Sequence, residues 1–501
     1  MSFKIAFIGA GSIGFTRSLL RDVLSVPEFS DIEIAFTDID KRNLQMVTEL
    51  CQRDIKENGR MISIQATMNR REALKDARYI FSVVRIGGLE AFETDISIPL
   101  QYGVDQCVGD TLSAGGIMYG QRGIHEMLSI CKDIREVAEP DCLLLNYANP
   151  MAMLTWACNE FGGVHTIGLC HGVQGGHNQI ANVFGLKKEE IDIVCAGINH
   201  QTWYIQIKHQ GEDLTGKLLE AFEAHEEYKQ TEKVRIDILR RFGYYSTESN
   251  GHLSEYVPWY RKRPEEIQEW IDLGSWINGE TGGYLRVCTE GRNWFMEDFP
   301  NWMNEPAYEY SQDKRSEEHG SYIIEGLETG RVYRGHFNTI NRGVITNLPD
   351  DAIIEAPGYV DRNGINVPQV GELPLGCAAV CQASISVQRL AVMAAVHGDD
   401  SLLRQAFMMD PLVGAVCSPP EIWQMVDDML IAGEKWLPQY RNSILEAKER
   451  RDHQPRLATK SYEGAARLKT KSIDEMKANR AEASRNAKEA DKAKNRPASL
   501  S

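Results

Sequence analysis

The chain begins with an apolar run that ends in a glycine motif, and this start restricts the fold more than any other feature. Residues 4–14 read KIAFIGAGSIG, which places Gly9, Gly11 and Gly14 at the spacing GxGxxG after a predicted strand. The first glycine permits a tight turn, the second lets backbone amides approach a pyrophosphate, and the third allows close helix packing. A helical pattern follows at once, so the motif predicts a strand, turn and helix that bind a dinucleotide.

The second predicted strand supplies the acid that such a site needs. The stretch IEIAFTDID ends in two carboxylates, Asp38 and Asp40, about where a ribose-binding acid is expected after the glycine loop. We expect Asp38 to take this role, with Asp40 as the next candidate. An acid at this place, rather than an arginine, favours NAD over NADP.

Short apolar runs alternate with helical patterns in the first part of the chain, which is typical of a parallel sheet with helices on both faces. We therefore expect an α/β protein in which residues 1–195 form a Rossmann-like, doubly wound parallel sheet that binds NAD. Residues 196–447 contain antiparallel strand patterns and two helical stretches, 384–398 and 420–440. They are expected to form a C-terminal α+β domain for substrate and metal, in an arrangement like that of lactate and malate dehydrogenases.

The end of the chain has a different composition from the rest. Residues 448–501 contain few large apolar side chains and more Lys and Arg than Asp and Glu. Such a segment cannot offset its ordering entropy by burial, so we expect a disordered or loosely helical tail without a catalytic role. A contact between this tail and an acidic partner surface is the alternative.

Charge and cysteine usage restrict the partners and the compartment. A net charge of -16 and a pI near 5.3 disfavour nucleic acid and anionic membranes as partners and favour a small neutral substrate. The sequence has neither a signal peptide pattern nor a long apolar span. Its eleven cysteines form no CxxC pair, which favours reduced thiols in the cytoplasm.

A Cys-His pair and a second His lie outside the dinucleotide motif. Cys170 ends an apolar strand pattern in IGLCHGVQGG, and His200 ends AGINH. A thiolate and an imidazole suit a borderline divalent cation and would leave coordination positions for substrate oxygens and water. On residue types alone, a buried structural cysteine and a core histidine explain these residues more simply.

Several longer stretches follow one another in an informative order. They are GAGS in the glycine loop, DTLSAGGI from Asp110, NYANPMAM from Asn146, GLCHGVQG from Gly168, AGINH, YYSTESNGHLSEY from Tyr244 and ITNLPDDAIIEAPGYVDRNGI from Ile345. Together they resemble glycoside hydrolase family 4, the NAD- and manganese-dependent glycosidases. The nearest likeness within the family is to bacterial α-galactosidases that hydrolyse melibiose. It extends from about Lys4 to about Tyr440, and the tail has no counterpart in it.

The resemblance implies a reaction that is unusual for a glycosidase. NAD on the glycine loop, which includes Ser12, takes a hydride from C3 of the sugar, a base removes the C2 proton, and the C1 bond breaks by elimination. Water then adds, and the hydride returns to C3, so no net redox occurs. The family is an exception to the paired-carboxylate scheme. In this family the residues that match Cys170 and His200 hold the metal, which acts as a Lewis acid.

The resemblance also implies roles for individual side chains. The base is a tyrosine, and Tyr256 is its best match, although Tyr244 and Tyr245 lie close in sequence. His171, directly after the metal cysteine, is the candidate acid for the departing oxygen. Asn149 and Asp110 are expected at the substrate.

The sugar is left open between related classes. The chain reads CHGV and TESNGH where the nearest galactosidases read CHSV and TESSEH, and a CHG triplet also occurs in α-glucuronidase members. An α-glucuronidase, an α-galacturonidase or an α-glucosidase is therefore an alternative to an α-galactosidase. A uronic acid would need a cation, and the candidates are Arg286, Arg334 and Arg342.

Two alternatives from other classes share the nucleotide site. An NAD-dependent 2-hydroxy acid or sugar dehydrogenase would keep the hydride, and a sensor would bind NAD without turnover. Neither explains the Cys-His arrangement. Relatives are dimers or tetramers, so we expect a homodimer or homotetramer, with residues 270–303 as an interface or a lid.

Overall fold

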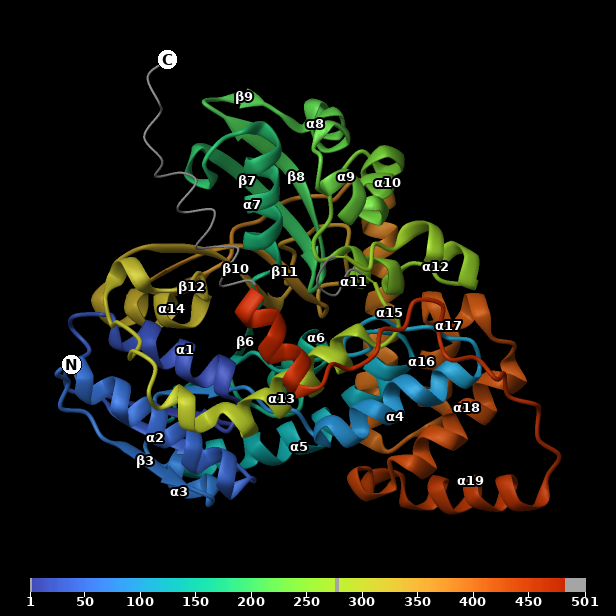
Figure 1. Cartoon of the computed structure of the whole chain (residues 1–501), viewed down its shortest axis with the longest axis horizontal. Coiled ribbons are helices and arrows are strands. Elements are labelled where there is room, and N and C mark those ends of the chain that lie inside the picture. Colours follow the sequence, from blue (N-terminus) through green and yellow to red (C-terminus); the bar gives the residue numbers. More distant parts are fainter. Residues whose placement is uncertain (1, 275–278, 483–501) are drawn as a thin grey trace.

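The computed structural model describes residues 2–274 and 279–482, and it contains a Rossmann-like parallel sheet at its N-terminal side (Figure 1). Neighbouring strands pair in parallel register along this half of the sheet. The strands stand in the order β3 (Ile64–Thr67), β2 (Glu33–Thr37), β1 (Lys4–Ile8), β4 (Tyr79–Ser82), β5 (Leu143–Asn146) and β6 (Thr166–Gly168). This order is the one that dinucleotide-binding sheets adopt, and it confirms the expected fold class.

Helices cover both faces of this parallel half because its strands are apolar on both sides. In β1, Ile5 and Phe7 belong to one hydrophobic core, whereas Ala6 and Ile8 belong to the other. The first core includes residues of α1 (Ile13–Leu24), α2 (Lys41–Glu57) and α14 (His319–Thr329). The second includes residues of α3 (Arg70–Leu74), α5 (Ser113–Val137) and α6 (Met151–Glu160).

The sheet continues beyond β6 with antiparallel strands. Its second half runs through β10 (Tyr333–Ile340), β11 (Ile353–Asp361), β7 (Ile191–Ile198), β8 (Gln201–His209) and β9 (Glu212–Asp213), and β12 (Gly364–Asn366) pairs with β11. The expected domain boundary at residue 195 therefore falls inside β7. The two expected units share one mixed sheet because β10 pairs with both β6 and β11.

The remaining helices lie around this sheet and in a helical region at its side (Figure 1). The two helical stretches expected near the end of the chain are confirmed by α15 and α18. The helices are α4 (Gly88–Gln101), α7 (Gly172–Phe184), α8 (Leu218–Ala224), α9 (Tyr228–Thr231), α10 (Lys233–Phe242), α11 (Asn250–Tyr256), α12 (Pro264–Trp270), α13 (Gly283–Trp302), α15 (Leu375–His397), α16 (Asp400–Met409), α17 (Pro411–Val416), α18 (Pro419–Ala432) and α19 (Arg441–His453).

Helix α15 is long and apolar enough to cross a membrane by length and composition, with a mean hydropathy of 1.4. Half of that stretch is buried inside the protein, where it packs against α5, α6 and α16. A helix with these contacts is the central helix of a protein core.

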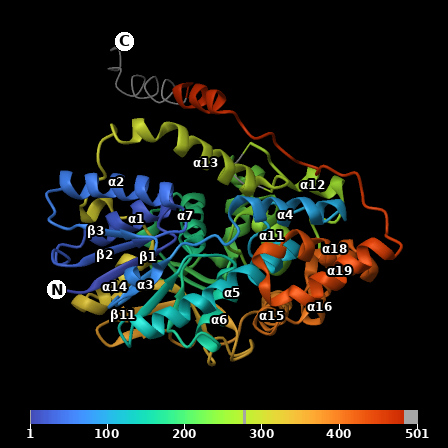
Figure 2. The ribbon, with the colours of Figure 1, turned by 90° about the horizontal axis from the view of Figure 1, so that it is seen from below.

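The described part of the C-terminal segment follows a defined path and ends in a helix. Residues 448–453 complete α19, the chain then runs in extended form across the molecule, and residues 473–482 form a helix. Figure 2 shows this segment passing outside α18 and reaching the outer side of α13. It is held by polar contacts rather than by a large apolar surface, which composition alone does not reveal. The expectation for residues 483–501 lies outside the described residues.

Candidate active site

The glycine loop has the shape that a bound dinucleotide requires. Gly9 has φ of +81°, and a Cβ atom there would lie 3.0 Å from the backbone of Val83. The amides of Gly9 and Ala10 donate to the carbonyl of Thr37, and Ser12 precedes the first turn of α1 without using its side chain as a cap. The turn and the start of α1 are therefore arranged to receive a phosphate group.

Asp38 contacts the glycine loop directly. Its Oδ2 atom accepts a hydrogen bond of 2.8 Å from the Gly11 amide, and a Cβ atom on Gly11 would lie 2.8 Å from the same oxygen. Asp40 is exposed and caps α2 by accepting from Asn43. Asp38, at the end of β2, is thus the carboxylate that lies beside the nucleotide loop.

Gly14 does not have the packing role that the motif suggests. It is exposed, and a Cβ atom there would meet no described atom within 4 Å. The helix therefore tolerates a side chain at this position, whereas Gly9 and Gly11 are restricted by their neighbours.

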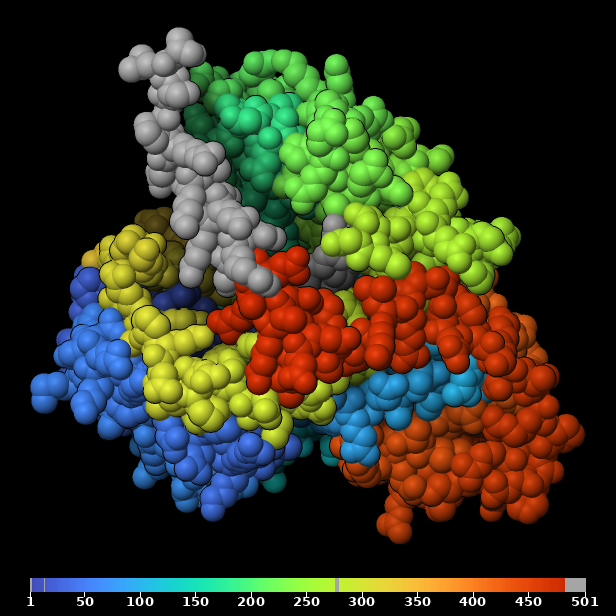
Figure 3. Space-filling view, in the orientation of Figure 1, coloured from blue at the N-terminus to red at the C-terminus, as the bar shows by residue number. Residues whose placement is uncertain are grey.

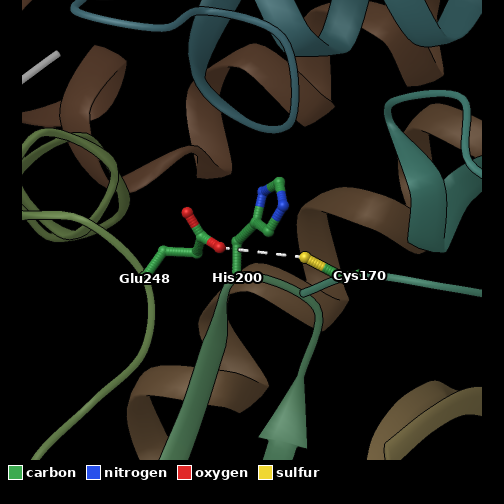
Figure 4. A group of neighbouring side chains, drawn as sticks. All are labelled: Cys170, His200 and Glu248. Atoms are coloured by element: carbon green, nitrogen blue, oxygen red, sulfur yellow. Dashed lines mark hydrogen bonds between the residues drawn. The ribbon is translucent and has the colours of Figure 1, made fainter. Parts of the chain in front are cut away.

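Three potential metal ligands converge next to the carboxyl end of β6 (Figure 4). Cys170 follows β6, His200 lies in the turn between β7 and β8, and Glu248 precedes α11. Their ligand atoms lie within 4.8 Å of one another, and Cys170 Sγ is 3.8 Å from Glu248 Oε1. Sulfur, nitrogen and carboxylate oxygen form a donor set that fits a borderline divalent ion such as Mn²⁺.

Glu248 was missed by the sequence prediction. It lies in TESNGH, within the stretch YYSTESNGHLSEY that contributes to the family resemblance. A carboxylate just before the helix that carries Tyr256 was the available signal. The distance in sequence between Glu248 and the other two residues gave no reason to join them.

The electrostatic environment suits metal binding. Burial lowers the pKa of His200 to about 4, so its imidazole is neutral and able to act as a ligand. Burial and the neighbouring carboxylates of Glu248 and Glu355 raise the pKa of the Cys170 thiol well above its usual value. The Cys170 thiolate therefore needs a cation, and metal binding must release its proton.

Tyr256 is the tyrosine that the fold brings to this group. Its hydroxyl lies 3.4 Å from Nδ1 of His200, and burial raises the pKa of Tyr256 well above its usual value. Tyr245 is instead a core residue, since its hydroxyl donates to Gln179 and its ring stacks on Phe222.

Asn149 and Asp110, the two residues expected at the substrate, lie next to each other. Asn149 donates from Nδ2 to Asp110 Oδ2 over 3.1 Å. Arg85, which follows β4, lies 3.8 Å from Asp110 and is enclosed by the rings of Phe92, Tyr119 and Tyr284. Arg85 was missed by the sequence prediction, although it stands at the carboxyl end of a predicted strand, where ligands bind.

His171 is exposed next to Cys170. Its Nδ1 atom lies 3.1 Å from Glu318, which raises the pKa of His171 to about 9. The imidazole thus carries a proton at neutral pH and has one to donate.

The three arginines considered for a uronic acid are differently placed. Arg286 forms ion pairs of 2.5 Å with Glu280 and 3.0 Å with Glu290, so its charge is already offset. Arg334 donates to the carbonyl of Ile193 on β7. Arg342 lies in the turn after β10, where its amide donates to the carbonyl of Asp350.

A dinucleotide-binding loop and a candidate cation site lie at the carboxyl ends of the parallel strands of one sheet. This combination indicates a protein that uses both a nucleotide cofactor and a metal ion. Two family models, described as Family 4 glycosyl hydrolase and Family 4 glycosyl hydrolase C-terminal domain, match residues 4–186 and 195–413. The chain belongs to this family of glycosyl hydrolases, which confirms the resemblance seen in the sequence.

Curated relatives and solved structures agree with this assignment. The chain is 58% identical over 478 residues to an alpha-galactosidase from Rhizobium meliloti, covering 95% of this chain and 97% of that one. It is 35% identical over 445 residues to an alpha-galactosidase from Bacillus subtilis, covering 87% and 100%. A 6-phospho-alpha-glucosidase from gut microorganisms, solved with NAD and glucose-6-phosphate, is similar with a TM-score of 0.72 and 26% identity, covering 87% and 99%.

Proposed function

We propose that this protein hydrolyses α-galactosides in a reaction that uses NAD and a divalent metal ion, with Mn²⁺ as the expected ion. The observation that carries the proposal is the 58% identity with an alpha-galactosidase over 95% of the chain. The grouping of Cys170, His200 and Glu248 beside Tyr256 supports it, because a metal-assisted proton abstraction needs a base next to the ion.

The cofactors supply the chemistry that amino acid side chains lack. The Gly9 to Gly14 loop and Asp38 would hold NAD, which would supply reversible hydride transfer at C3 of the sugar. Cys170, His200 and Glu248 would hold the metal ion, which would supply Lewis acidity.

The side chains of the site perform the proton transfers. Tyr256 accepts the proton from C2, and its position 3.4 Å from His200 brings the phenol next to the metal ligands. A neighbouring cation favours the phenolate and thereby opposes the effect of burial. His171, exposed beside Cys170, donates a proton to the departing glycosidic oxygen, and Asn149 and Asp110 bind sugar hydroxyls.

The charges around the site favour a neutral sugar over a uronic acid. Asp110 is acidic and bonds to Asn149, so a substrate carboxylate beside this pair would be repelled. Arg85 lies 3.8 Å from Asp110, and Arg286 forms ion pairs with Glu280 and Glu290, so the positive charges of both arginines are already offset. The dehydrogenase and sensor alternatives are not favoured, because the family is one of hydrolases.

A comparison of substrates tests this proposal. Aryl α-galactoside, α-glucoside, α-glucuronide and α-galacturonide are assayed side by side with NAD and Mn²⁺ present. The galactoside is expected to have the highest kcat/KM. A clear preference for a uronide, abolished selectively by a substitution at Arg85 or Arg286, would instead assign the enzyme to that sugar class.

Location in the cytoplasm and assembly into a homodimer or homotetramer complete the proposal. None of the described cysteines forms a disulfide, which supports a reducing compartment. Cell fractionation tests the first point, and light scattering on the purified protein tests the second. A secreted or monomeric protein would contradict them.

A further inference from the structure

The C-terminal strap, residues 455–482, crosses several elements on one face of the molecule (Figure 3). It first fastens to α18, where the amide of Leu457 donates to Gln424 and the side chain of Gln424 donates back to the carbonyl of Leu457. It then reaches the end of α4, where the amide of Lys460 donates to the carbonyl of Gln101 over 2.7 Å and its Nζ atom donates to that of Tyr102. These contacts give the strap a fixed path.

The strap next contacts a buried carboxylate, Asp105. The hydroxyl of Tyr462 and the amide of Ala465 each donate to Asp105 Oδ2 over 3.0 Å. Asp105 also receives hydrogen bonds from Arg261, 2.7 Å to Oδ1, and from Thr281, 2.8 Å to Oδ1. Asp105 is 1% exposed and Arg261 is fully buried. One charge thus joins the strap to two other segments, and charge-assisted bonds of this kind are among the strongest that proteins make.

The strap also pairs with the segment that enters α13. Thr281 donates from its amide to the carbonyl of Ala466 over 3.2 Å, and Ala466 donates back to the Thr281 hydroxyl over 3.4 Å. Ala466 is buried against Ile267 and Ile271. A Cβ atom on Gly464 would lie 2.5 Å from the side chain of Thr281, so the strap backbone packs closely against that side chain.

Asp105 begins the loop that ends at the substrate residue Asp110. The carbonyls of Gln106 and Cys107 accept from Gly282 and Tyr284 at the start of α13, over 2.7 and 3.2 Å. The amides of Val108 and Gly109 donate to Glu255, which directly precedes Tyr256. The loop of residues 105–110 is therefore held between α13 and α11.

The end of the strap lies on the outer side of α13 (Figure 2). The amide of Lys471 donates to Glu290, and Arg480 forms ion pairs with Asp298 and Glu305 at 3.8 and 3.0 Å. Arg480 also stacks on the ring of Trp294. These contacts hold the strap against the outer side of α13. The start of α13 in turn contacts the loop of residues 105–110.

We propose that the C-terminal strap is a positioning element for the reaction, and that Asp105 is the positioning residue through which it acts. With the strap in place, the loop of residues 105–110 and the start of α13 are fixed against α11, and this fixes Asp110 and Tyr256 relative to each other. The inference rests on the proposed function of these two residues. The expectation that the tail has no counterpart among the α-galactosidases is wrong, because the match to the Rhizobium meliloti relative spans 478 residues and so extends beyond residue 447. The Bacillus subtilis relative, by contrast, is matched over its whole length by 87% of this chain.

Two truncations test the inference. One variant ends at residue 454, and its control ends at residue 482 and so retains the strap. Loss of the strap is expected to lower kcat about ten- to a hundredfold with KM changed less than about threefold, because misplaced catalytic groups affect the transition state most. The control is expected to match the full chain.

A point variant and a hydrogen-exchange measurement test the inference even if the variant that ends at residue 454 folds poorly. Tyr462→Phe removes one hydrogen bond to Asp105, and Tyr308→Phe is its control on an exposed ring. Hydrogen exchange should increase in residues 103–110 and 279–290 of the Tyr462 variant, while β1 and β2 remain protected. Unchanged exchange in the loop together with unchanged kcat would overturn the inference. An inactive full chain would overturn the proposed function alone, because the exchange result does not depend on activity.

Discussion

The Tyr256 hydroxyl lies 3.4 Å from Nδ1 of His200. The Thr111 hydroxyl lies 3.0 Å from the same nitrogen, so the candidate base and a candidate metal ligand share one small polar environment. Burial alone would keep this phenol protonated at neutral pH, since it raises the pKa of Tyr256. If Tyr256 is the base, its ionisation would therefore depend on a cation bound by the neighbouring ligands.

Tyr256→Phe keeps the ring and removes the hydroxyl of the proposed base. Hydrolysis should slow by about 10² to 10⁴-fold, the usual contribution of a positioned acid or base. NAD and Mn²⁺ should bind as in the unchanged protein, which calorimetry checks. Tyr245→Phe is the control, because that hydroxyl bonds to Gln179 in the core. Equal losses in both variants would refute the assignment.

The nucleotide half of the site was predictable from the sequence because its signals are local. The glycine spacing follows one strand, the acid follows the next, and alternating apolar runs indicate a parallel sheet. The structure distinguishes Asp38, which contacts Gly11, from Asp40, which caps α2. Sequence spacing alone ranked these two acids without separating their roles.

The other half depends on contacts between distant segments. Glu248 meets Cys170 and His200 only because the turn between β7 and β8 and the start of α11 lie beside the end of β6. No local sequence pattern indicates that these three residues are close in space. The path of the strap could not be predicted for another reason. The strap is held by polar contacts with residues such as Asp105 rather than by apolar burial.

Asp38→Ala and Asp40→Ala form a matched pair for the nucleotide site. Loss of the Asp38 carboxylate should weaken NAD binding about ten- to a hundredfold, as expected for a hydrogen bond to a charged group. Loss of Asp40 should leave NAD affinity intact and cost about 1 kcal/mol of stability through the lost cap of α2. Fluorescence titration and thermal unfolding measure the two effects. The reverse pattern would assign the ribose contact to Asp40.

Glu248→Gln tests the third candidate metal ligand. The substitution keeps the shape but removes the negative charge, so Mn²⁺ affinity should fall by more than about tenfold, and Cys170→Ser should have at least this effect. Metal content after dialysis and electron paramagnetic resonance report binding without reference to activity. Cys142→Ser, at the opposite end of the sheet, is the control for loss of a buried thiol. Full Mn²⁺ binding by the Glu248 variant would exclude Glu248 as a ligand.

The ion pair between Asp95 and Arg122 joins α4 to α5, with bonds of 2.9 and 2.5 Å and both side chains 2% exposed. Asp95→Ala leaves a buried guanidinium without its partner and should cost about 3–5 kcal/mol of unfolding free energy. The double variant Asp95→Leu, Arg122→Met should recover much of this loss, because it removes both charges. Chemical denaturation measures both. A double variant as unstable as the single one would contradict this account.

The fate of the hydrogen at C2 of the sugar tests the central claim most directly. Hydrolysis of an aryl α-galactoside is run in D₂O with NAD and Mn²⁺, and the released galactose is examined by NMR and mass spectrometry. If Tyr256 removes the C2 proton during each turnover, deuterium from solvent should appear at C2, a C2-deuterated substrate should react more slowly, and NADH should not accumulate. Galactose that keeps its original C2 hydrogen, released at the same rate from both substrates, would show direct displacement at C1 and contradict the mechanism.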